Sequence, residues 1–365
     1  MPEQNISQEQ LKALQEKIKQ MSPEELKEFQ KKQCIFCQIV AGKIQSRKVY
    51  EDDNVIAILD INPANPGHTL LLTKEHYSII PQVPDDEIAH IFMVAKSLSN
   101  SMLRSIDSQG TNVIVANGVA AGQRAQHFMV HVIPRKENDG VNFILPQKTI
   151  DLQEIELIGN KLVTALGGVM EKEAAKEESK SGINLDDIAK REGCLVCQIV
   201  GNRIPSKKVY EDELVIAVLD VNGANPGHCF VIPKNHYPII EQVPDIEIVR
   251  LFQVSNKISS AIFESLGAQG TNLFIANGIA AGQTVAHFTI NVIPRKENDG
   301  VNLQWQPKQL SEEEISTVEL KLKEQTRNIG HFEKEEKKPR MQAPNPVALS
   351  GEEEEYFSRQ MRRLP

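Results

Sequence analysis

Two Cys-x-x-Cys pairs, Cys34/Cys37 and Cys194/Cys197, carry the most reactive side chains of this sequence. A fifth cysteine, Cys229, stands alone. The chain opens with a polar, helix-patterned stretch that does not resemble a secretory signal, so we expect a cytoplasmic protein. In that compartment the two pairs indicate metal or redox chemistry rather than a disulfide framework.

A second group of chemically capable residues lies in two similar stretches, "AGQRAQHFMVHVIPR" from Ala121 and "AGQTVAHFTINVIPR" from Ala281. Each stretch reads as a Gly-Gln turn followed by a strand, and alternate residues of a strand face the same way. One face of each strand is therefore expected to carry three side chains in a column: His127, Met129 and His131 in the first, and His287, Thr289 and Asn291 in the second.

Both stretches belong to a duplication. The segment from Cys34 to Tyr77 aligns without a gap with the segment from Cys194 to Tyr237, and the same shift still holds at Asn302. The offset between the copies is 160 residues, which corresponds to a whole domain rather than a solenoid repeat. Strand patterns such as "VIAILD", "TLLLT", "NVIVAN" and "HFMVHVI" dominate each copy, with one long helical pattern that begins near "VPDDEIAHIF". Each copy is predicted to be α+β, an antiparallel sheet with a helix on one face.

The segments outside the copies set the expected domain boundaries. Near the N-terminus, Ser22 and Glu25 form a capping-box pattern at the start of a helix. We expect a helical extension over 1–33, a first domain over 34–150, a helix and charged linker over 151–192, a second domain over 193–308, a helix over 309–327 and a polar tail over 328–365 that is a candidate for disorder or for docking on a partner.

Composition narrows the function further. The net charge is −8, so no basic surplus indicates a nucleic-acid partner. No apolar run approaches the length of a membrane-spanning helix.

The motifs "CIFCQIV", "LDINPANPGHTLL", "KEHY" and "NGVAAGQ", followed by a histidine and "VIPR", resemble the HIT (histidine triad) family in this order. The resemblance covers both copies. It implies two HIT-like domains, each with a five-stranded antiparallel sheet and helices, that pair as a pseudo-dimer within one chain. It also implies a protein that binds purine nucleotides and breaks phosphoanhydride or phosphoramidate bonds.

The resemblance also implies one structural zinc ion per domain. Its ligands would be the Cys-x-x-Cys pair, the histidine of the "K-x-H-Y" segment and the first histidine of the triad. Four such ligands form a closed tetrahedral set, which is typical of structural rather than catalytic zinc. The alternative is that the thiols are free and the histidines are ordinary polar residues. The predicted ligands are Cys34, Cys37, His76 and His127 in the first copy, and Cys194, Cys197, His236 and His287 in the second.

A nucleotide pocket follows from the same resemblance, with the "NPGH" histidines His68 and His228 behind it as supports. In each copy an aspartate would accept from the ribose hydroxyls, and an asparagine and a glutamine would donate to phosphate oxygens. The alternatives are a turn residue for each aspartate, a polar hairpin residue for each glutamine, and a hydrogen-bonded interior histidine for His68 and His228. The predicted residues are Asp60, Asn117, Gln123, Arg124 and His131 in the first copy, and Asp220, Asn277, Gln283 and Thr284 in the second.

The nucleophile of the family, the middle histidine of the triad, is replaced in both copies. Met129 has a neutral thioether in its place, and Thr289 has a hydroxyl that needs an adjacent base to attack phosphorus. Asn291, which would have to be that base, does not titrate. The covalent route is therefore absent, and His131 is the residual candidate for catalysis.

Three functions remain open. The first is a nucleotide sensor or scaffold without turnover, in which the first copy, with more of the family's residues, is the better binder. The second is a hydrolase or nucleotidyl transferase with weak or unconventional activity. The third is an interaction platform that acts through residues 1–33 or 328–365.

Overall fold

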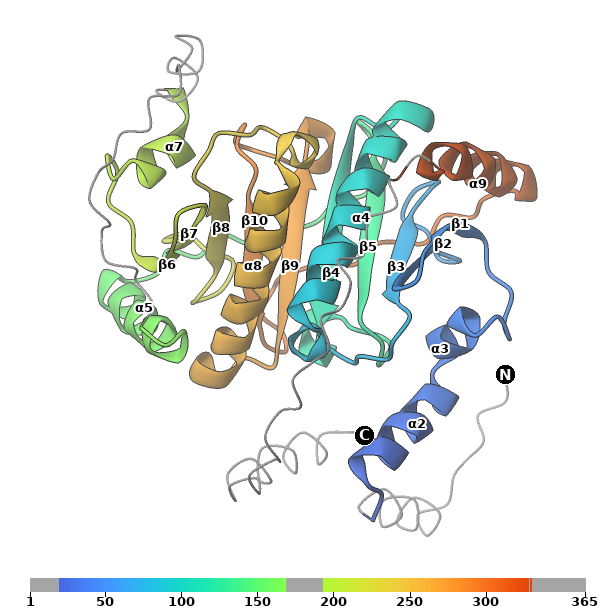
Figure 1. The fold of residues 1–365 in the computed structure, drawn as a ribbon. Helices are drawn as coiled ribbons and strands as arrows, with labels where there is room; N and C mark the ends of the chain where they lie inside the picture. The colour runs from blue at the N-terminus through green and yellow to red at the C-terminus, as the bar shows by residue number, and fades with distance from the viewer. Residues whose placement is uncertain (1–19, 169–192, 328, 330–365) are drawn as a thin grey trace. The chain divides into compact units, whose positions relative to one another are not determined.

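The computed structural model describes residues 20–168, 193–327 and 329 (Figure 1). The first copy and its flanks contain α2 (Pro23–Gln33), α3 (Ile35–Val40), β1 (Lys48–Glu51), β2 (Val55–Leu59), β3 (Thr69–Thr73), η1 (Ile80–Gln82), α4 (Asp85–Ser105), β4 (Gly110–Asn117), η2 (Val119–Ala121), β5 (Met129–Arg135) and α5 (Leu152–Ala165).

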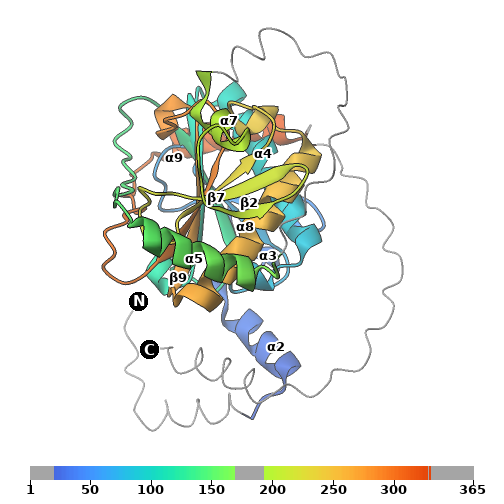
Figure 2. The ribbon, with the colours of Figure 1, turned by 90° about the vertical axis from the view of Figure 1, so that its left-hand side faces the viewer.

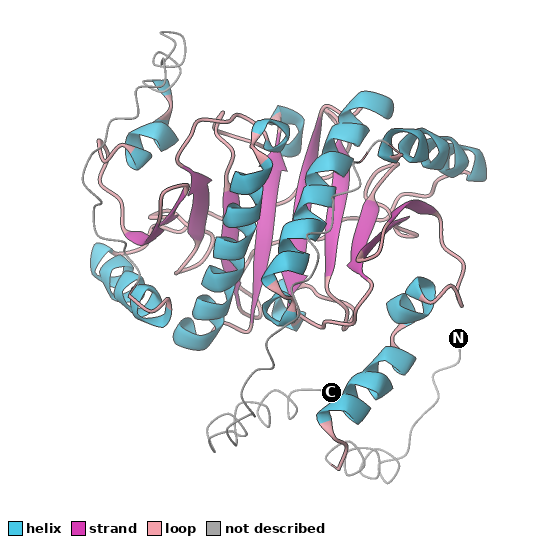
Figure 3. Ribbon diagram, viewed as in Figure 1, coloured by secondary structure: helices cyan, strands magenta, loops and turns pink. Residues whose placement is uncertain are grey.

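The second copy repeats this order. It contains α7 (Leu195–Val200), β6 (Lys208–Glu211), β7 (Val215–Leu219), β8 (Cys229–Pro233), η3 (Ile240–Gln242), α8 (Asp245–Leu266), β9 (Gly270–Asn277), η4 (Ile279–Ala281), β10 (Ile290–Arg295) and α9 (Glu312–Thr326). Helices and strands are distinguished in Figure 3. Each copy has five antiparallel strands and one long helix, which confirms the predicted fold.

The two sheets join into one sheet of ten strands, in the order β1-β2-β3-β5-β4-β9-β10-β8-β7-β6. The join is the antiparallel pair β4 and β9, which runs in register from Thr111 opposite Asn277 to Asn117 opposite Thr271. On one face of the sheet α4 and α8 lie side by side (Figure 1). Phe92 and Phe252 stack there with ring centroids 3.6 Å apart. The two copies therefore contact each other through both the sheet and the helices.

The local sequence explains why these elements form. Strands β2 and β7 are buried throughout and consist of branched apolar residues and one alanine each, as expected for the interior of a covered sheet. Three acidic residues occupy the first turn of α4, where the helix dipole favours negative charge. At α2 both hydrogen bonds of the predicted capping box between Ser22 and Glu25 are present.

The segments that follow β5 and β10 exchange places between the copies. They run on the face of the sheet opposite α4 and α8 (Figure 2) and meet where Ile144 and Asn302 pair through two backbone hydrogen bonds. Lys148 then donates its backbone N–H to Gly223 of the second copy, and Lys308 donates its own to Pro63 of the first. Each copy is thus built partly from the other copy's C-terminal segment.

The exchange continues in the helices. Helix α5, which follows the first copy, packs on α8 and β6 of the second, and α9 packs on α4 and β1 of the first. Lys207 binds Glu156 of α5 at 2.6 Å, and Arg47 binds Glu319 of α9 at 2.6 Å. Both ends of the sheet are therefore covered by a helix from the other half of the chain, as an otherwise exposed edge strand requires.

One expected column of side chains is shorter than predicted. Strand β5 begins at Met129 and β10 begins at Ile290, so His127, His287 and Thr289 lie before the strands rather than on them. The predicted charged linker lies largely outside the described residues, as do most of the N-terminal extension and nearly all of the polar tail. None of the described helices combines the length and apolar content needed to span a membrane.

Candidate functional site

The first Cys-x-x-Cys pair meets two histidines in a compact group. The Sγ atoms of Cys34 and Cys37 lie 3.5 and 3.6 Å from Nδ1 of His127, and Sγ of Cys37 lies 3.2 Å from Nδ1 of His76. The four residues come from the start of α3, the loop after β3 and the loop before β5. The second copy brings Cys194, Cys197, His236 and His287 together in the same way, at 3.3 to 3.6 Å.

The hydrogen bonds of the triad histidines fix which ring nitrogen is available to a metal. Nε2 of His127 lies 3.0 Å from the carbonyl oxygen of Thr73, and Nε2 of His287 lies 3.1 Å from that of Pro233. A carbonyl only accepts, so Nε2 carries the proton and donates. The lone pair is then on Nδ1, which faces the sulfur atoms. Such an outer hydrogen bond typically orients a metal-ligating histidine.

The donor set fits a zinc ion. With bond lengths of about 2.3 Å to sulfur and 2.0–2.1 Å to nitrogen, a tetrahedral site separates a sulfur from a nitrogen by about 3.5 Å. The Cys–His separations in both groups lie close to this value. Burial and the neighbouring Cys34 raise the pKa of Cys37 to about 12. Two thiolates would therefore need a cation between them, and zinc supplies that charge.

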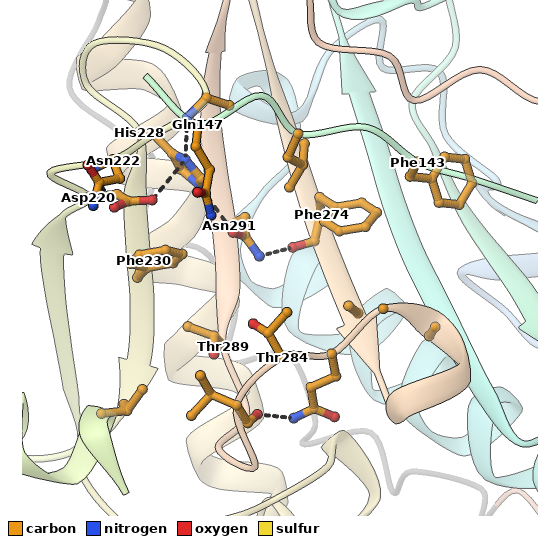
Figure 4. Close-up of a pocket in the computed structure, with 18 of the residues that line it drawn as sticks. Phe143, Gln147, Asp220, Asn222, His228, Phe230, Phe274, Thr284, Thr289 and Asn291 are labelled. Carbon is orange, nitrogen blue, oxygen red and sulfur yellow. Dashed lines mark hydrogen bonds and ion pairs between the residues drawn. The ribbon is translucent and has the colours of Figure 1, made fainter. Parts of the chain in front are cut away.

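A cavity of about 590 Å³ opens on the face of the second copy's sheet that is opposite α8 (Figure 4). A volume of this size suits a small ligand. Its wall combines the turn after β7, the loop after η4, strand β10 and residues 142–147 of the first copy's exchanged segment. Predicted residues among its lining are Asp220, His228, Gln283 and Thr284, and Thr289 and Asn291 lie there too.

In the wall of this cavity a chain of hydrogen bonds links four residues of the second copy. The N–H of Ala224 donates to Nδ1 of His228 at 3.1 Å, so the imidazole proton is on Nε2, which donates to Oδ1 of Asn291 at 3.1 Å. The asparagine amide in turn donates to the carbonyl of Phe274 at 3.0 Å. Burial lowers the pKa of His228, so its imidazole stays neutral.

The first copy has the same arrangement with a histidine in the last position. The N–H of Ala64 donates to Nδ1 of His68, and Nε2 of His68 then donates to Nδ1 of His131 at 3.1 Å. Burial lowers the pKa of both imidazoles to about 3. Asn291 accepts the same hydrogen bond as His131, which explains how the second copy keeps this network without the third histidine.

The position of the family's nucleophile holds different side chains in the two copies. Met129 packs beside an apolar cluster that includes Ile56 and Leu72. Thr289 faces the cavity (Figure 4), and its hydroxyl donates to the carbonyl of His287 at 2.9 Å. No described hydrogen bond links this hydroxyl to a basic group that would remove its proton.

Two of the predicted phosphate donors point elsewhere. Asn117 and Asn277 are only 4% and 1% exposed and lie at the seam between the copies. The amide of Asn117 donates to Oγ1 of Thr271, and its Oδ1 accepts from the N–H of Ile80. In the same way, the amide of Asn277 donates to Oγ1 of Thr111, and its Oδ1 accepts from the N–H of Ile240. Both amides join the two copies on the helix-covered face, so phosphate binding by them would require these hydrogen bonds to be exchanged, and it stays a prediction.

The glutamines and Arg124 make hydrogen bonds within the protein. Both amide hydrogens of Gln123 are used on backbone carbonyls, at 2.6 and 3.0 Å, and its Oε1 accepts from the N–H of Gly118. Gln283 repeats this pattern. The glutamines therefore brace the hairpin and have no donor left for a phosphate. Arg124 instead donates to Oε1 of Gln304 at 2.6 Å.

Both aspartates fill the turn role, and ribose binding by them stays a prediction. Oδ1 of Asp60 and of Asp220 accepts the N–H of the residue two positions later, at 2.9 Å, which is the turn role. Oδ2 of each lies 3.6 Å from Nδ1 of the neighbouring histidine. Asp220 nevertheless lines the cavity, so its carboxylate is in place for a ligand.

Aromatic residues of the site were not identified from the sequence. Phe230 and Phe274 line the second cavity, with Phe143 from the first copy. In the first copy, Trp305 of the second copy's exchanged segment lies against His68 and His131, with ring centroids 5.0 and 5.3 Å apart. These residues differ between the two copies at matched positions, which is the only signal the sequence offered.

Acid should weaken the fold through the neutral imidazoles. Their pKa is depressed in the folded state, so the unfolded chain binds more protons below about pH 6.5, and stability falls as the pH drops. We expect His131→Asn, which copies the residue of the second domain, to remove part of this sensitivity. Between pH 7 and pH 5 the wild type should lose about 2 kcal/mol more unfolding free energy than the variant. Urea unfolding at both pH values checks this, and equal losses would contradict it.

Comparison with known proteins identifies the family of this chain. The HIT domain model matches residues 41–138 and 202–298, more than half of the chain. An uncharacterized HIT-like protein of Methanocaldococcus jannaschii is 42% identical over 123 residues, 33% of this chain and 95% of that protein. Adenylylsulfatase HINT3 of Arabidopsis thaliana is 40% identical over 106 residues, 29% of this chain and 54% of that protein, so the match spans about half of its length.

Among solved structures, a Zn-bound histidine triad family protein from Mycobacterium smegmatis is 33% identical over 31% of this chain and 81% of that one, with a TM-score of 0.30. The family assignment itself rests on the domain model, which matches both copies, and on the Methanocaldococcus relative, which is matched over nearly its whole length. The chain belongs to the HIT, or histidine triad, family.

Proposed function

We propose that this chain is a zinc-stabilised HIT protein that binds a purine nucleotide in the cavity of its second copy and does not form the covalent nucleotidyl intermediate. The observation that carries this proposal is the lining of that cavity. It joins aromatic side chains, a carboxylate and an open glycine loop, with Thr289 where the nucleophile would be. Family membership gives the general class, since HIT proteins belong to a nucleotide-binding and hydrolase superfamily.

Each part of a nucleotide has a counterpart in this lining. Phe230 and Phe274 offer aromatic faces for a purine, and stacking on an aromatic ring is favourable for every base. The carboxylate of Asp220 accepts from two ribose hydroxyls. The N–H groups of Gly282 and Gln283 already donate to backbone carbonyls, so the hydroxyl and backbone N–H of Thr284 are the donors proposed for phosphate oxygens. The Arabidopsis relative is named for an adenylyl substrate, so we propose adenine nucleotides first.

Turnover is disfavoured by the same residues. The hydroxyl of Thr289 donates to a backbone carbonyl, and Asn291 cannot accept a proton at neutral pH. A threonine without an adjacent base is a poor nucleophile. In the first copy Met129 is a neutral thioether, so neither copy has the group that attacks phosphorus.

Zinc would serve the fold rather than the reaction. In each copy two cysteines and two histidines would hold it, and four protein ligands leave no open position for a substrate. When bound, it ties the N-terminal knuckle at α3 or α7 to the loop before β5 or β10. The bound metal thereby adds to folding free energy.

Asp220→Ala should weaken AMP binding by about 10- to 100-fold, because it removes hydrogen bonds from a charged acceptor to the ribose. Isothermal titration calorimetry with AMP measures this. The matched control is Asp60→Ala, which removes the same turn hydrogen bond in the first copy. We expect it to leave AMP affinity within about twofold. Equal weakening by both variants, or no binding of any adenine nucleotide to the wild type, would refute the proposal.

A further inference from the structure

The two pockets are completed by exchanged segments that differ in sequence. Five residues of the first copy's segment line the cavity of the second: Asn142, Phe143, Leu145, Pro146 and Gln147. The matched residues of the second copy reach the first, where the indole N–H of Trp305 donates to the carbonyl of Asn62 at 2.9 Å. Trp305 is the only tryptophan of the chain, and Leu145 occupies its matched position.

In the first copy, Trp305 lies where the second copy has its cavity. Its ring meets the rings of His68 and His131 edge-on, at interplanar angles of 74° and 66°. The counterparts of these two histidines, His228 and Asn291, line the cavity of the second copy. An indole is much larger than the leucine side chain at the matched position, so the first copy is filled where the second is hollow.

Gln304 covers the glycine loop of the first copy. A Cβ added to Gly122 would lie 2.5 Å from Nε2 of Gln304, and Oε1 of the same amide accepts from Arg124. At the matched Gly282, none of the described atoms outside its immediate neighbours lies within 4 Å of such a Cβ. The loop expected to approach a phosphate is therefore covered in the first copy and open in the second.

The side chains that line the two pockets also differ between the copies. Phe230 and Phe274 line the second cavity, whereas the matched residues of the first copy are Leu70 and Ile114. The first copy thus lacks the two aromatic faces and has gained an indole from the other half of the chain. This reverses the expectation that the first copy, which keeps His131 and Arg124, is the better binder.

We infer that the two HIT pockets have divided their roles: the second binds one nucleotide per chain, and the first is closed by Trp305 and Gln304, which we call the plug. The inference rests on the proposed function for the second pocket. The plug takes the place of a ligand: its indole covers the two histidines, and its amide covers the glycine loop. It also joins the second copy's exchanged segment to the first copy's core.

The number of bound nucleotides tests this inference directly. Equilibrium dialysis of the full chain with AMP should give one AMP per chain for the wild type. Trp305→Leu, which installs the residue of the matched position, should give two, and the added site should be lost with Asp60→Ala. The reverse substitution, Leu145→Trp, should weaken binding at the second pocket at least tenfold. The double variant Trp305→Leu, Gln304→Ala is included because the Gln304 amide could keep the first pocket closed after the indole is removed.

The possible outcomes distinguish a failure of the plug from a failure of nucleotide binding in the second pocket. Two AMP per wild-type chain would overturn the plug and leave nucleotide binding intact. No AMP on the wild type but one on the Trp305→Leu chain would support the plug and refute the second pocket. An unchanged count for both Trp305 variants would overturn the plug. Thermal unfolding and zinc content of each variant confirm that it is folded. In the wild type, saturating AMP should leave the fluorescence of Trp305 unchanged, whereas a large shift would mean that the ligand displaces the plug.

Discussion

Thr289→His should make the second pocket hydrolyse adenosine 5′-phosphoramidates at least about 10³-fold faster than the wild type. The substitution places a neutral imidazole where it can attack phosphorus and form a labile P–N bond. The gain is only part of the roughly 10⁴- to 10⁶-fold that a nucleophile contributes in hydrolases with a covalent intermediate. It is incomplete because Asn291 stands where the family has its third histidine. Release of AMP from AMP-morpholidate, followed by chromatography, measures the rate.

The first copy supplies the matched control. Met129→His introduces the same side chain at the same position, but Trp305 lies over the neighbouring His68 and His131. We expect no more than a small gain from this variant. A large gain from Met129→His together with none from Thr289→His would mean that the first pocket, rather than the second, admits the substrate.

Cys194→Ser should release the zinc ion of the second copy and lower the content of the chain from two zinc ions to one. Structural zinc sites bind with about 10–16 kcal/mol of apparent free energy. Losing even about 5 kcal/mol of this should lower the melting temperature by about 10 °C or more. We expect the fold of the second copy to depend on this site because Cys194 is the N-cap of α7 and Cys197 lies within that helix. Elemental analysis and calorimetry measure the two effects.

Cys229 provides the control for that substitution. It is buried and its Sγ donates to the carbonyl of Gly227, as the hydroxyl of Thr69 does to Gly67 in the first copy. Cys229→Thr should therefore keep two zinc ions and most of the stability. If the Cys194 variant also retained two zinc ions, the four-residue group would not be the metal site.

Local pattern was enough to predict much of the fold. The apolar runs at β2 and β7 give buried strands, and the Ser22–Glu25 spacing gives the start of α2. The pseudo-dimer was implied by the resemblance of both copies to the HIT family, whose members usually pair through their sheets. These features depend on residues close in sequence, or on one symmetry, and so they are readable without coordinates.

The site was harder to predict for physical reasons. Strands β4 and β9 are buried on both faces, so no alternation of polar and apolar residues indicates which way Asn117 or Asn277 points. The exchanged segments place Trp305 against Asn62, 243 residues apart, and no local pattern encodes that contact. The glutamines carried a correct motif, but a motif does not reveal that their amide hydrogens are already used.

A crystal structure of the full chain soaked with AMP tests the central claim most directly. The account predicts one AMP in the second pocket, its purine against Phe230 or Phe274, its ribose at Asp220 and its phosphate at the Gly282 loop. It also predicts no bond from phosphorus to the protein, and Trp305 still lying against His68 and His131. AMP in the first pocket, or phosphorus bonded to any protein atom, would contradict it.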